Sequence, residues 1–299
     1  MDIRAALREA MARLRAAQVP SYTLAAELLL MHVLGRDRAW IYTHPEESVE
    51  PIALEKFFAL VARRSAGEPT QYLTGKQEFW GLEFEVTPAV LIPRPETEHV
   101  VEVALERLGL RGIKINMATG APSPPLNIAD VGTGSGCLAI ALAHELPHAG
   151  IVATDTSAAA LEVARRNSRR HGVSDRVRFL QTDLLTSVHA SLQEAATFDV
   201  IVSNPPYVAR NEADQLPREV REHEPHSALF GGSTGVEIYA RLIEQSAVVL
   251  RRGGILVLEL GYNSLNPVRG LLYNQVAWVN VNVTDDLAGI PRVVAAERS

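Results

Sequence analysis

The chain has 299 residues, a length that suits one large domain together with a smaller one. Its hydrophobic content of 47% is ordinary for a soluble globular protein, and no apolar run is long enough to cross a bilayer. The formal net charge of -6 disfavours direct binding of nucleic acid, because such proteins usually carry a basic face. One cysteine, Cys137, excludes an internal disulfide and a cysteine-cluster metal site, so no metal is expected. The charged sequence after Met1 carries no secretion signal, and together these features predict a cytoplasmic protein that binds no membrane.

The first part of the chain, residues 1–75, has the periodicity of short amphipathic helices. One helix is expected before Pro20, a second between a capping Ser21 and Gly35, and a third over residues 51–64. Three such helices predict a small bundle, and the pattern is typical of a packing or docking module without chemistry of its own.

The period changes between residues 76 and 92, where aromatic side chains surround Gly81. This pattern favours a β-hairpin that links the bundle to a second domain over residues 93–299. A helix is expected to begin near Thr97, and the Gly- and Pro-containing stretch 117–125 is expected to be a surface loop.

Strands alternate with helices through the rest of the chain, which places the protein in the α/β class. The alternation predicts a mostly parallel, doubly wound sheet, and two final strands without a helix between them would add an antiparallel edge. The expected strands are 127–131, 150–154, 177–181, 198–202, 255–260, 276–283 and 292–297, and the expected helices are 137–145, 157–171 and 238–250.

A glycine-rich loop follows the first of these strands, from Asp130 to Gly136. Glycines are needed where the backbone turns sharply or touches a ligand, and the following helix offers unpaired N–H groups. A dinucleotide loop has the spacing G-x-G-x-x-G, whereas this loop has G-x-G-x-G led by a carboxylate. A carboxylate repels pyrophosphate and suits a cationic ammonium or sulfonium group, which favours S-adenosyl-L-methionine as the ligand. The expected contacts are Asp130, Gly132, Thr133, Gly134, Ser135 and Gly136.

Two further acids follow the next two strands, and both are expected to bind the same cofactor. The Asp155 carboxylate can accept hydrogen bonds from both hydroxyls of a ribose. Both S-adenosylmethionine and NAD contain a ribose, so this residue alone supports either ligand. Asp183 could accept a hydrogen bond from an adenine amino group, and Leu184 would then pack against the adenine base. Either acid alone could be a helix cap or a loop residue. Their placement at successive strand ends favours a ligand, because open α/β sheets bind ligands there.

The fourth strand ends in the sequence Asn204-Pro205-Pro206-Tyr207. Two prolines fix φ and remove two donors, so nearby carbonyls point outward from a rigid turn. The Asn204 side-chain oxygen and the Pro205 carbonyl could hold the two hydrogens of a planar amide or an aromatic amine, with Tyr207 stacked on the planar group. No strong base is required, since the proton can leave after alkylation, and the turn would act by orientation and electrostatics. Asn204, Pro205 and Tyr207 are therefore the expected catalytic residues, all four residues of the turn are expected to bind the substrate, and Asn204 is expected to contact the cofactor as well.

With these motifs in view, the chain resembles the HemK/PrmC family, the N5-glutamine methyltransferases of peptide-chain release factors. The resemblance covers nearly the whole sequence. One matching segment is Leu91–Glu98, and its part from Pro93 to Glu98 matters most, because the Asn-Pro-Pro-Tyr turn also occurs in adenine-N6 DNA methylases. The other matching segments are Gly67–Pro69, Tyr72–Gly75, Phe79–Leu82, Asp130–Gly136, Asn204–Tyr207, Glu224–Leu229 and Asp286–Gly289.

The resemblance implies a class I, Rossmann-like methyltransferase with a seven-stranded sheet, a helical N-terminal domain and a hairpin linker. It implies that the substrate is the glutamine of the Gly-Gly-Gln motif of class I release factors and that the N-terminal domain docks the rest of the release factor. We expect the protein to be a monomer. Arg94, Glu96 and Thr97 would line the substrate cleft. Leu184 departs from the pattern, because some members carry an aromatic residue there.

Two other functions stay open. An adenine-N6 methyltransferase of nucleic acid would use the same chemistry, although the acidic charge and the lack of a recognisable target-reading domain disfavour it. A module that binds a release factor without catalysis is disfavoured by the intact loop at Gly132 and the intact turn at Asn204.

Overall fold

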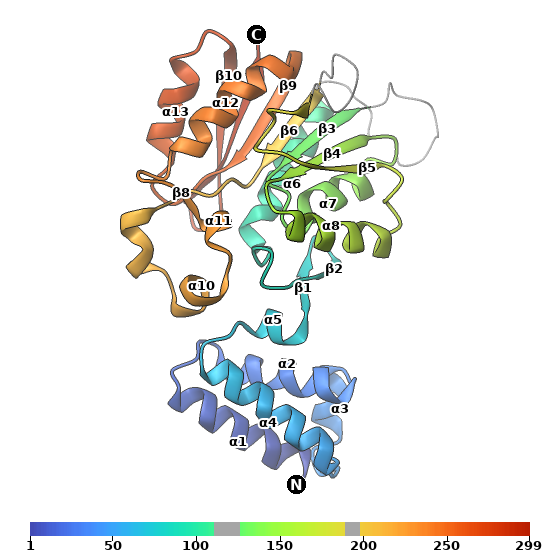
Figure 1. The fold of residues 1–299 in the computed structure, drawn as a ribbon. Helices are drawn as coiled ribbons and strands as arrows, with labels where there is room; N and C mark the ends of the chain where they lie inside the picture. Colours follow the sequence, from blue (N-terminus) through green and yellow to red (C-terminus); the bar gives the residue numbers. More distant parts are fainter. Residues whose placement is uncertain (111–125, 189–197) are drawn as a thin grey trace. The chain divides into compact units, whose positions relative to one another are not determined.

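The structure is a computed structural model that describes residues 1–110, 126–188 and 198–299 (Figure 1). Within these residues the chain forms two compact units. Unit 1 contains residues 1–76 together with 216–224, and unit 2 contains the remaining described residues. The stretch 117–125, expected to be a surface loop, lies outside the described residues.

Unit 1 is a bundle of short helices around a single apolar core. Three of its helices are those expected from the periodicity, and α3 and α5 are two further short ones that the periodicity did not reveal. We expected the Ser21 side chain to cap α2, but it makes no capping hydrogen bond, and the backbone of Ser21 is left-handed (φ 49°). The helices of residues 1–76 are α1 (Ile3–Ala16), α2 (Tyr22–Leu34), α3 (Arg38–Thr43), α4 (Pro51–Ser65) and α5 (Thr70–Thr74).

A segment distant in sequence completes unit 1, the short helix α10 (Arg218–His223). The Arg64 side chain on α4 is only 6% exposed and forms an ion pair with Glu219 of α10. The same guanidinium donates to the Glu68 carbonyl at 3.2 Å. Because a buried guanidinium is costly without a partner, this pair attaches α10 to the bundle.

Unit 2 is built on a seven-stranded sheet, as expected. The strand order is β10-β11-β9-β6-β3-β4-β5, and β11 runs antiparallel to both of its neighbours while β9, β6, β3, β4 and β5 are mutually parallel. The last strand thus inserts between β9 and β10, which gives the expected antiparallel edge. The strands are β3 (Asn127–Val131), β4 (Gly150–Asp155), β5 (Val177–Gln181), β6 (Phe198–Ser203), β9 (Leu250–Glu259), β10 (Trp278–Asp285) and β11 (Pro291–Arg298).

Helices cover both faces of this sheet, and alternate residues of each central strand point to opposite faces. On β3, Ile128 faces the cluster that contains α6 (Glu98–Leu110) and α7 (Cys137–Glu145), while Ala129 faces the cluster that contains α12 (Glu237–Val249) and α13 (Leu265–Tyr273). Helix α8 (Ala158–Arg170) packs beside α7 against β4 and β5. The arrangement is the doubly wound sheet that the alternation of elements predicts.

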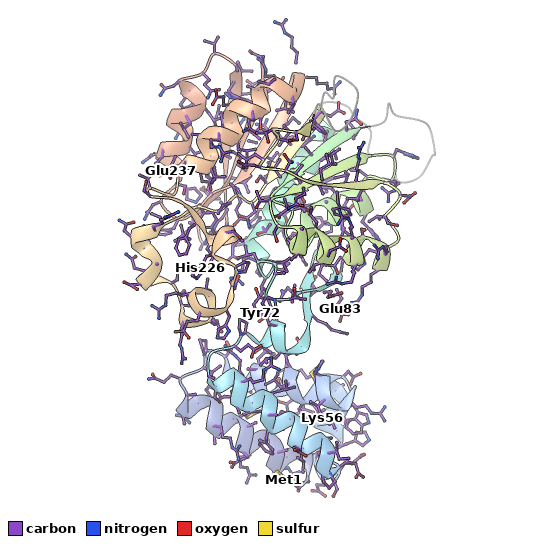
Figure 2. All side chains as sticks on the ribbon, in the orientation of Figure 1. Met1, Lys56, Tyr72, Glu83, His226 and Glu237 are labelled. Atoms are coloured by element: carbon purple, nitrogen blue, oxygen red, sulfur yellow. The ribbon has the colours of Figure 1, made fainter. Side chains whose placement is uncertain are left out.

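The expected hairpin forms from β1 (Lys76–Phe79) and β2 (Leu82–Glu85). Its two-residue turn, Trp80-Gly81, has φ values of 55° and 70°, the pair of left-handed residues that a tight hairpin requires. Strand β2 packs against α8, where the Glu85 N–H donates to the Asn167 side chain and Glu83 forms an ion pair with Arg170. Figure 2 labels Glu83 among the side chains of this unit.

Short elements complete unit 2: η1 (Pro95–Thr97), β7 (Val208–Ala209), η2 (Arg210–Gln215), α11 (His226–Leu229) and β8 (Phe230–Gly232). Among the described residues no helix is both long and apolar enough to span a membrane.

The attachment of α10 leads to a stability prediction. We expect Arg64→Met to lower the free energy of unfolding by about 2 kcal/mol, because the Glu219 carboxylate loses a buried partner. Arg63→Met is the matched control: the Arg63 side chain is 55% exposed in its pair with Glu68, so this change should cost about 0.5 kcal/mol or less. Urea unfolding followed by circular dichroism measures both values, and equal losses would contradict the role given to Arg64.

Candidate active site

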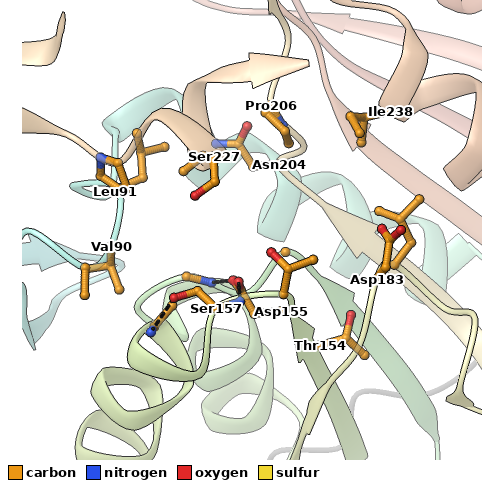
Figure 3. Close-up of a pocket in the computed structure, with 18 of the residues that line it drawn as sticks. Val90, Leu91, Thr154, Asp155, Ser157, Asp183, Asn204, Pro206, Ser227 and Ile238 are labelled. Carbon is orange, nitrogen blue, oxygen red and sulfur yellow. Dashed lines mark hydrogen bonds between the residues drawn. The ribbon is translucent and has the colours of Figure 1, made fainter. Parts of the chain in front are cut away.

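The pieces of the site come together because four parallel strands end at one edge of the sheet. The register pairs Val131 of β3 with Thr154 of β4 and with Ser203 of β6, and it pairs Asp155 with Gln181 of β5. The segments that follow these strands therefore lie next to one another, where open α/β sheets bind ligands. A pocket opens there, lined by Ala89–Leu91, Gly132, Gly134, Thr154–Ser157, Ala160, Thr182–Leu184, Asn204, Pro206, Pro225, Ser227, Ala228 and Ile238 (Figure 3).

The glycines of the loop after β3 serve two different purposes. Gly132 and Gly134 line the pocket with φ values of 74° and 55°, and a Cβ on either would meet no atom within 4 Å. They are therefore required for the left-handed backbone and leave the pocket side of the loop uncovered. Gly136 is required for space as well, since a Cβ there would lie 3.1 Å from side-chain atoms of both Ala164 and Ile140.

Asp130 lies beneath the loop and is fully buried. Its Oδ2 accepts from the Thr133 hydroxyl at 2.6 Å and from the Ala139 N–H at 3.1 Å, so it ties the loop to the start of α7. Its other oxygen, Oδ1, has no hydrogen-bond partner within the described part of the chain. Burial raises the pKa of this carboxyl to about 7. Thr133 and Ser135 are buried with it.

Asp155 at the end of β4 does line the pocket. Its two oxygens already accept from the N–H groups of Gly134 at 2.9 Å and Ser157 at 2.8 Å, which fixes the carboxylate between the loop and α8 (Figure 3). Each carboxylate oxygen keeps a further lone pair for a ligand hydroxyl. Burial raises its pKa, although these N–H donors oppose the shift.

The segment after β5 forms a third wall of the pocket through Asp183 and Leu184. Leu184 has a φ of 52°, an uncommon conformation for a residue with a side chain. Such strain persists only where surrounding contacts enforce it, and here the next residue, Leu185, donates its N–H to the Gln245 side chain at 2.9 Å. Asp183 is half exposed and forms an ion pair with Arg241 of α12.

The turn after β6 lies across the pocket from Asp155, and Asn204 and Pro206 both line the pocket. Three glycines from other segments allow neighbouring backbone to approach this turn closely. A Cβ on Gly231 would collide with the Pro206 carbonyl oxygen, and one on Gly235 would collide with the Tyr207 carbonyl oxygen. A Cβ on Gly261 would lie 2.5 Å from Cδ2 of the Tyr207 ring. The turn is therefore closely packed against the stretch that contains Gly231 and Gly235 and against the stretch that contains Gly261.

A chain of hydrogen bonds connects this turn to a buried acid. The Asn204 Nδ2 group donates to the Thr97 hydroxyl at 3.0 Å, and that hydroxyl donates to Oε2 of Glu259 at 2.6 Å. Glu259 ends β9, the neighbour of β6, and is 3% exposed. Burial raises the pKa of Glu259 to about 7, with the Thr97 hydrogen bond acting in the opposite direction.

The expected residues divide into groups in the structure. Gly132, Gly134, Asp155, Asp183, Leu184, Asn204 and Pro206 line the pocket, whereas Asp130, Thr133, Ser135 and Gly136 lie behind its glycine loop. Pro205 and Tyr207 complete the turn, Arg94 and Glu96 act on Glu259 through their charges, and Thr97 bonds to it. Sequence reasoning missed Glu259 and the wall formed by Pro225, Ser227 and Ala228. A lone acid in the apolar run from Ile255 to Leu260 was the available signal for Glu259.

Two family models and several curated proteins match the sequence of this chain. Residues 5–75 match the PrmC N-terminal domain, and residues 119–221 match the methyltransferase small domain. The chain is 43% identical to a release factor glutamine methyltransferase of Koribacter versatilis and 43% identical to one of Moorella thermoacetica, in each case over 100% of this chain and 99% of the relative. The 298 aligned residues include the loop, the turn and the N-terminal helices.

Solved structures show the same fold at lower identity. The catalytic domain of hMettl16, solved with the MAT2A 3'UTR hairpin 6, matches with a TM-score of 0.57 and 19% identity over 80% of this chain and 81% of that one. A methyltransferase from Pyrococcus furiosus matches with a TM-score of 0.50 and 20% identity over 73% of this chain and 90% of that one. The likeness to these structures shows the fold, and the identity to the two curated relatives shows that the chain belongs to the release factor glutamine methyltransferase family.

Proposed function

We propose that this protein methylates the side-chain amide nitrogen (N5) of the glutamine in the Gly-Gly-Gln motif of class I peptide-chain release factors. The methyl donor is S-adenosyl-L-methionine. The observation that carries the proposal is the position of the Asn204 turn, at the edge of a pocket whose opposite wall holds Asp155 and the glycine loop. Donor and acceptor sites then face one another across a single cavity.

The residues of the pocket fit the cofactor. The backbone at Gly132 and Gly134 is open to the pocket, Asp155 keeps lone pairs for ribose hydroxyls, and the buried Asp130 places negative charge under the loop. Its unpartnered Oδ1 is an acceptor suited to a cationic amino acid group nearby. When bound, S-adenosylmethionine supplies an electrophilic methyl group, so that an N–C bond forms as an S–C bond breaks and the nitrogen then releases a proton.

The Asn204 turn orients the acceptor amide. The Asn204 side-chain oxygen and the Pro205 carbonyl accept its two hydrogens, which holds the nitrogen in one orientation toward the donor. Tyr207 stacks on the planar amide. Burial and the nearby charge of Glu259 raise the pKa of the Tyr207 hydroxyl, so Tyr207 stays neutral and acts by packing rather than as a base. The work of the turn is orientation and electrostatics.

The N-terminal domain, the linker and the residues before α6 have roles in substrate binding in this proposal. The helical domain over residues 1–75 docks the body of the release factor, residues 76–92 link it to the methyltransferase domain over 93–299, and Arg94 and Glu96 line the entrance for the Gly-Gly-Gln loop. Because release factors act on the ribosome, the reaction takes place in the cytoplasm, and the enzyme works as a monomer.

Methyl transfer from labelled S-adenosylmethionine tests the proposed function directly. We expect one methyl group on the Gly-Gly-Gln glutamine of a class I release factor, located by mass spectrometry, and no label on a release factor whose motif glutamine is changed to alanine. Label on DNA adenine but not on the release factor would instead support the adenine-N6 alternative. Cofactor binding without transfer to either would support a non-catalytic module.

The role of Asn204 leads to a kinetic prediction. We expect Asn204→Ala to lower kcat by about 100-fold or more, because a positioned acceptor for the amide hydrogens is lost, and to change the Kd for S-adenosylmethionine far less. Asn211→Ala, on the exposed surface of η2, is the matched control and should leave both values unchanged. Turnover by Asn204→Ala equal to that of the native enzyme would refute the assigned role.

The packing around the turn gives a second prediction. We expect Gly231→Ala to destabilise the fold by about 1–3 kcal/mol and to lower kcat, since the new Cβ must displace the Pro206 carbonyl. Gly270→Ala in α13, where a Cβ meets nothing within 4 Å, should instead leave stability unchanged or slightly higher. Thermal unfolding and initial rates measure the two effects, and a Gly231→Ala protein as stable and active as the control would argue against a close-packed turn.

A further inference from the structure

We propose that Glu259 and Thr97 are positioning residues, which hold the Asn204 side-chain amide in the one orientation that offers its oxygen to the acceptor. The inference rests on the proposed function, in which that oxygen accepts a hydrogen from the glutamine amide. Three elements supply the three groups: β9 ends at Glu259, η1 ends at Thr97, and Asn204 follows β6. The two hydrogen bonds that connect them are 2.6 and 3.0 Å long.

The direction of these bonds follows from the number of protons each group carries. An ionised Glu259 has only lone pairs, so the single hydroxyl proton of Thr97 goes to the carboxylate. The hydroxyl then offers only lone pairs to Asn204, and the Nδ2 end of the amide must face it. The Oδ1 end is thereby committed to a different partner. Without the carboxylate, either end of the Asn204 amide could bond to Thr97.

The burial of Glu259 and Thr97 makes this arrangement rigid. Both are about 3% exposed, so water does not compete for the hydroxyl proton. The charged and titratable groups around Glu259 are Arg94 and Glu96 before α6, Tyr207 after β6, Arg292 on β11, Tyr239 on α12 and Cys137 on α7. Burial raises the pKa values of both tyrosines and of Cys137, so these three groups stay protonated at neutral pH.

We expect kcat to depend on pH, because a protonated Glu259 no longer fixes the direction of the hydrogen bonds through Thr97 to Asn204. It can donate to Thr97, whose own proton is then free for either end of Asn204. The pKa of Glu259 is about 7, so kcat should rise as the pH increases through 7. Asp130 titrates in the same range, since its pKa is also about 7. Glu259→Gln separates the two groups, because the variant retains Asp130.

The kinetic test compares three changes in the full-length enzyme with its release factor substrate. At pH 8 we expect Thr97→Val to lower kcat about 10-fold or more, with the Kd for S-adenosylhomocysteine within about twofold of the native value. Thr97→Ser keeps the hydroxyl and should restore kcat to within about threefold. Glu259→Gln should lower kcat and abolish the rise through pH 7. Ser168→Ala is the matched control, because the buried Ser168 hydroxyl donates to the Arg165 carbonyl of its own helix, α8.

A double-mutant cycle distinguishes positioning from general loss of structure. In the Asn204→Ala background, Thr97→Val should lower kcat no further, since the group it orients is already absent. Additive losses, a native kcat in Thr97→Val, or a pH profile that Glu259→Gln leaves unchanged would each overturn the proposal.

A second readout needs no acceptor and therefore separates this proposal from the proposed function. In protein labelled with 15N-asparagine and bound to S-adenosylhomocysteine, the Asn204 side-chain NH2 signals are assigned by their loss in Asn204→Ala. We expect these signals to titrate near pH 7 in the native protein, to stop titrating in Glu259→Gln, and to shift in Thr97→Val. Signals that behave in this way in a protein that methylates no release factor would retain the positioning role and reject the substrate. Signals insensitive to both changes would reject the positioning role, whatever the substrate.

Discussion

The parallel register between β6 and β9 is the constraint on which the site depends. It pairs Ser203 with Leu258, so that Asn204 and Glu259 are the next residues along two neighbouring strands. Successive side chains on a strand point to opposite faces, and a slip by one residue would turn Glu259 away from Thr97 and leave a carboxylate buried without its donor. Strand β11 fixes β9 from the other side, where Val293 pairs with Glu259. Burial of Glu259 therefore favours this register, and the register places Glu259 beside the turn at Asn204.

Close approach of backbone segments is the second requirement of the site. The turn at Asn204 contains two prolines and cannot adjust its own φ angles, so its neighbours must leave room for it. Gly231 and Gly235 in one stretch of the chain, and Gly261 in another, provide that room. The acceptor side of the pocket is thus a rigid turn packed into rigid surroundings, which suits a reaction that depends on orientation more than on proton transfer.

Much of the fold could be predicted from the sequence, because the signals were local. The strand 127–131 and the helix 137–145 have the predicted bounds, since an apolar strand, a glycine loop and an apolar helix follow one another without interruption. Helix α13 was missed because Pro267 and Gly270 are usual helix breakers. Pro267 occupies the third position of α13, where the backbone N–H has no partner within the helix, so it is tolerated there.

The residues of the site were harder to predict where their role depends on distant partners. Glu259 stands between Leu258 and Leu260 in an apolar strand, and only the pairing with β6 shows that its carboxyl reaches Thr97. The association of residues 216–224 with unit 1 depends likewise on Arg64, more than 150 residues away in sequence. Asp130 was predicted from its charge alone, and the structure adds that it supports the loop from below.

The two buried carboxylates of the site lower the free energy of unfolding when they are ionised. The pKa values of Asp130 and Glu259 are raised to about 7, well above those of the same groups in an unfolded chain, so the folded state binds protons more tightly. Their contribution to the free energy of unfolding is greatest below about pH 4 and is lost as the pH rises through 7, at a cost on the order of 3 kcal/mol for each group. A glutamine at position 259 would avoid that cost but could turn either its oxygen or its nitrogen toward Thr97. An ionised carboxylate can only accept, and for this reason it fixes one direction for the whole chain of hydrogen bonds that ends at Asn204.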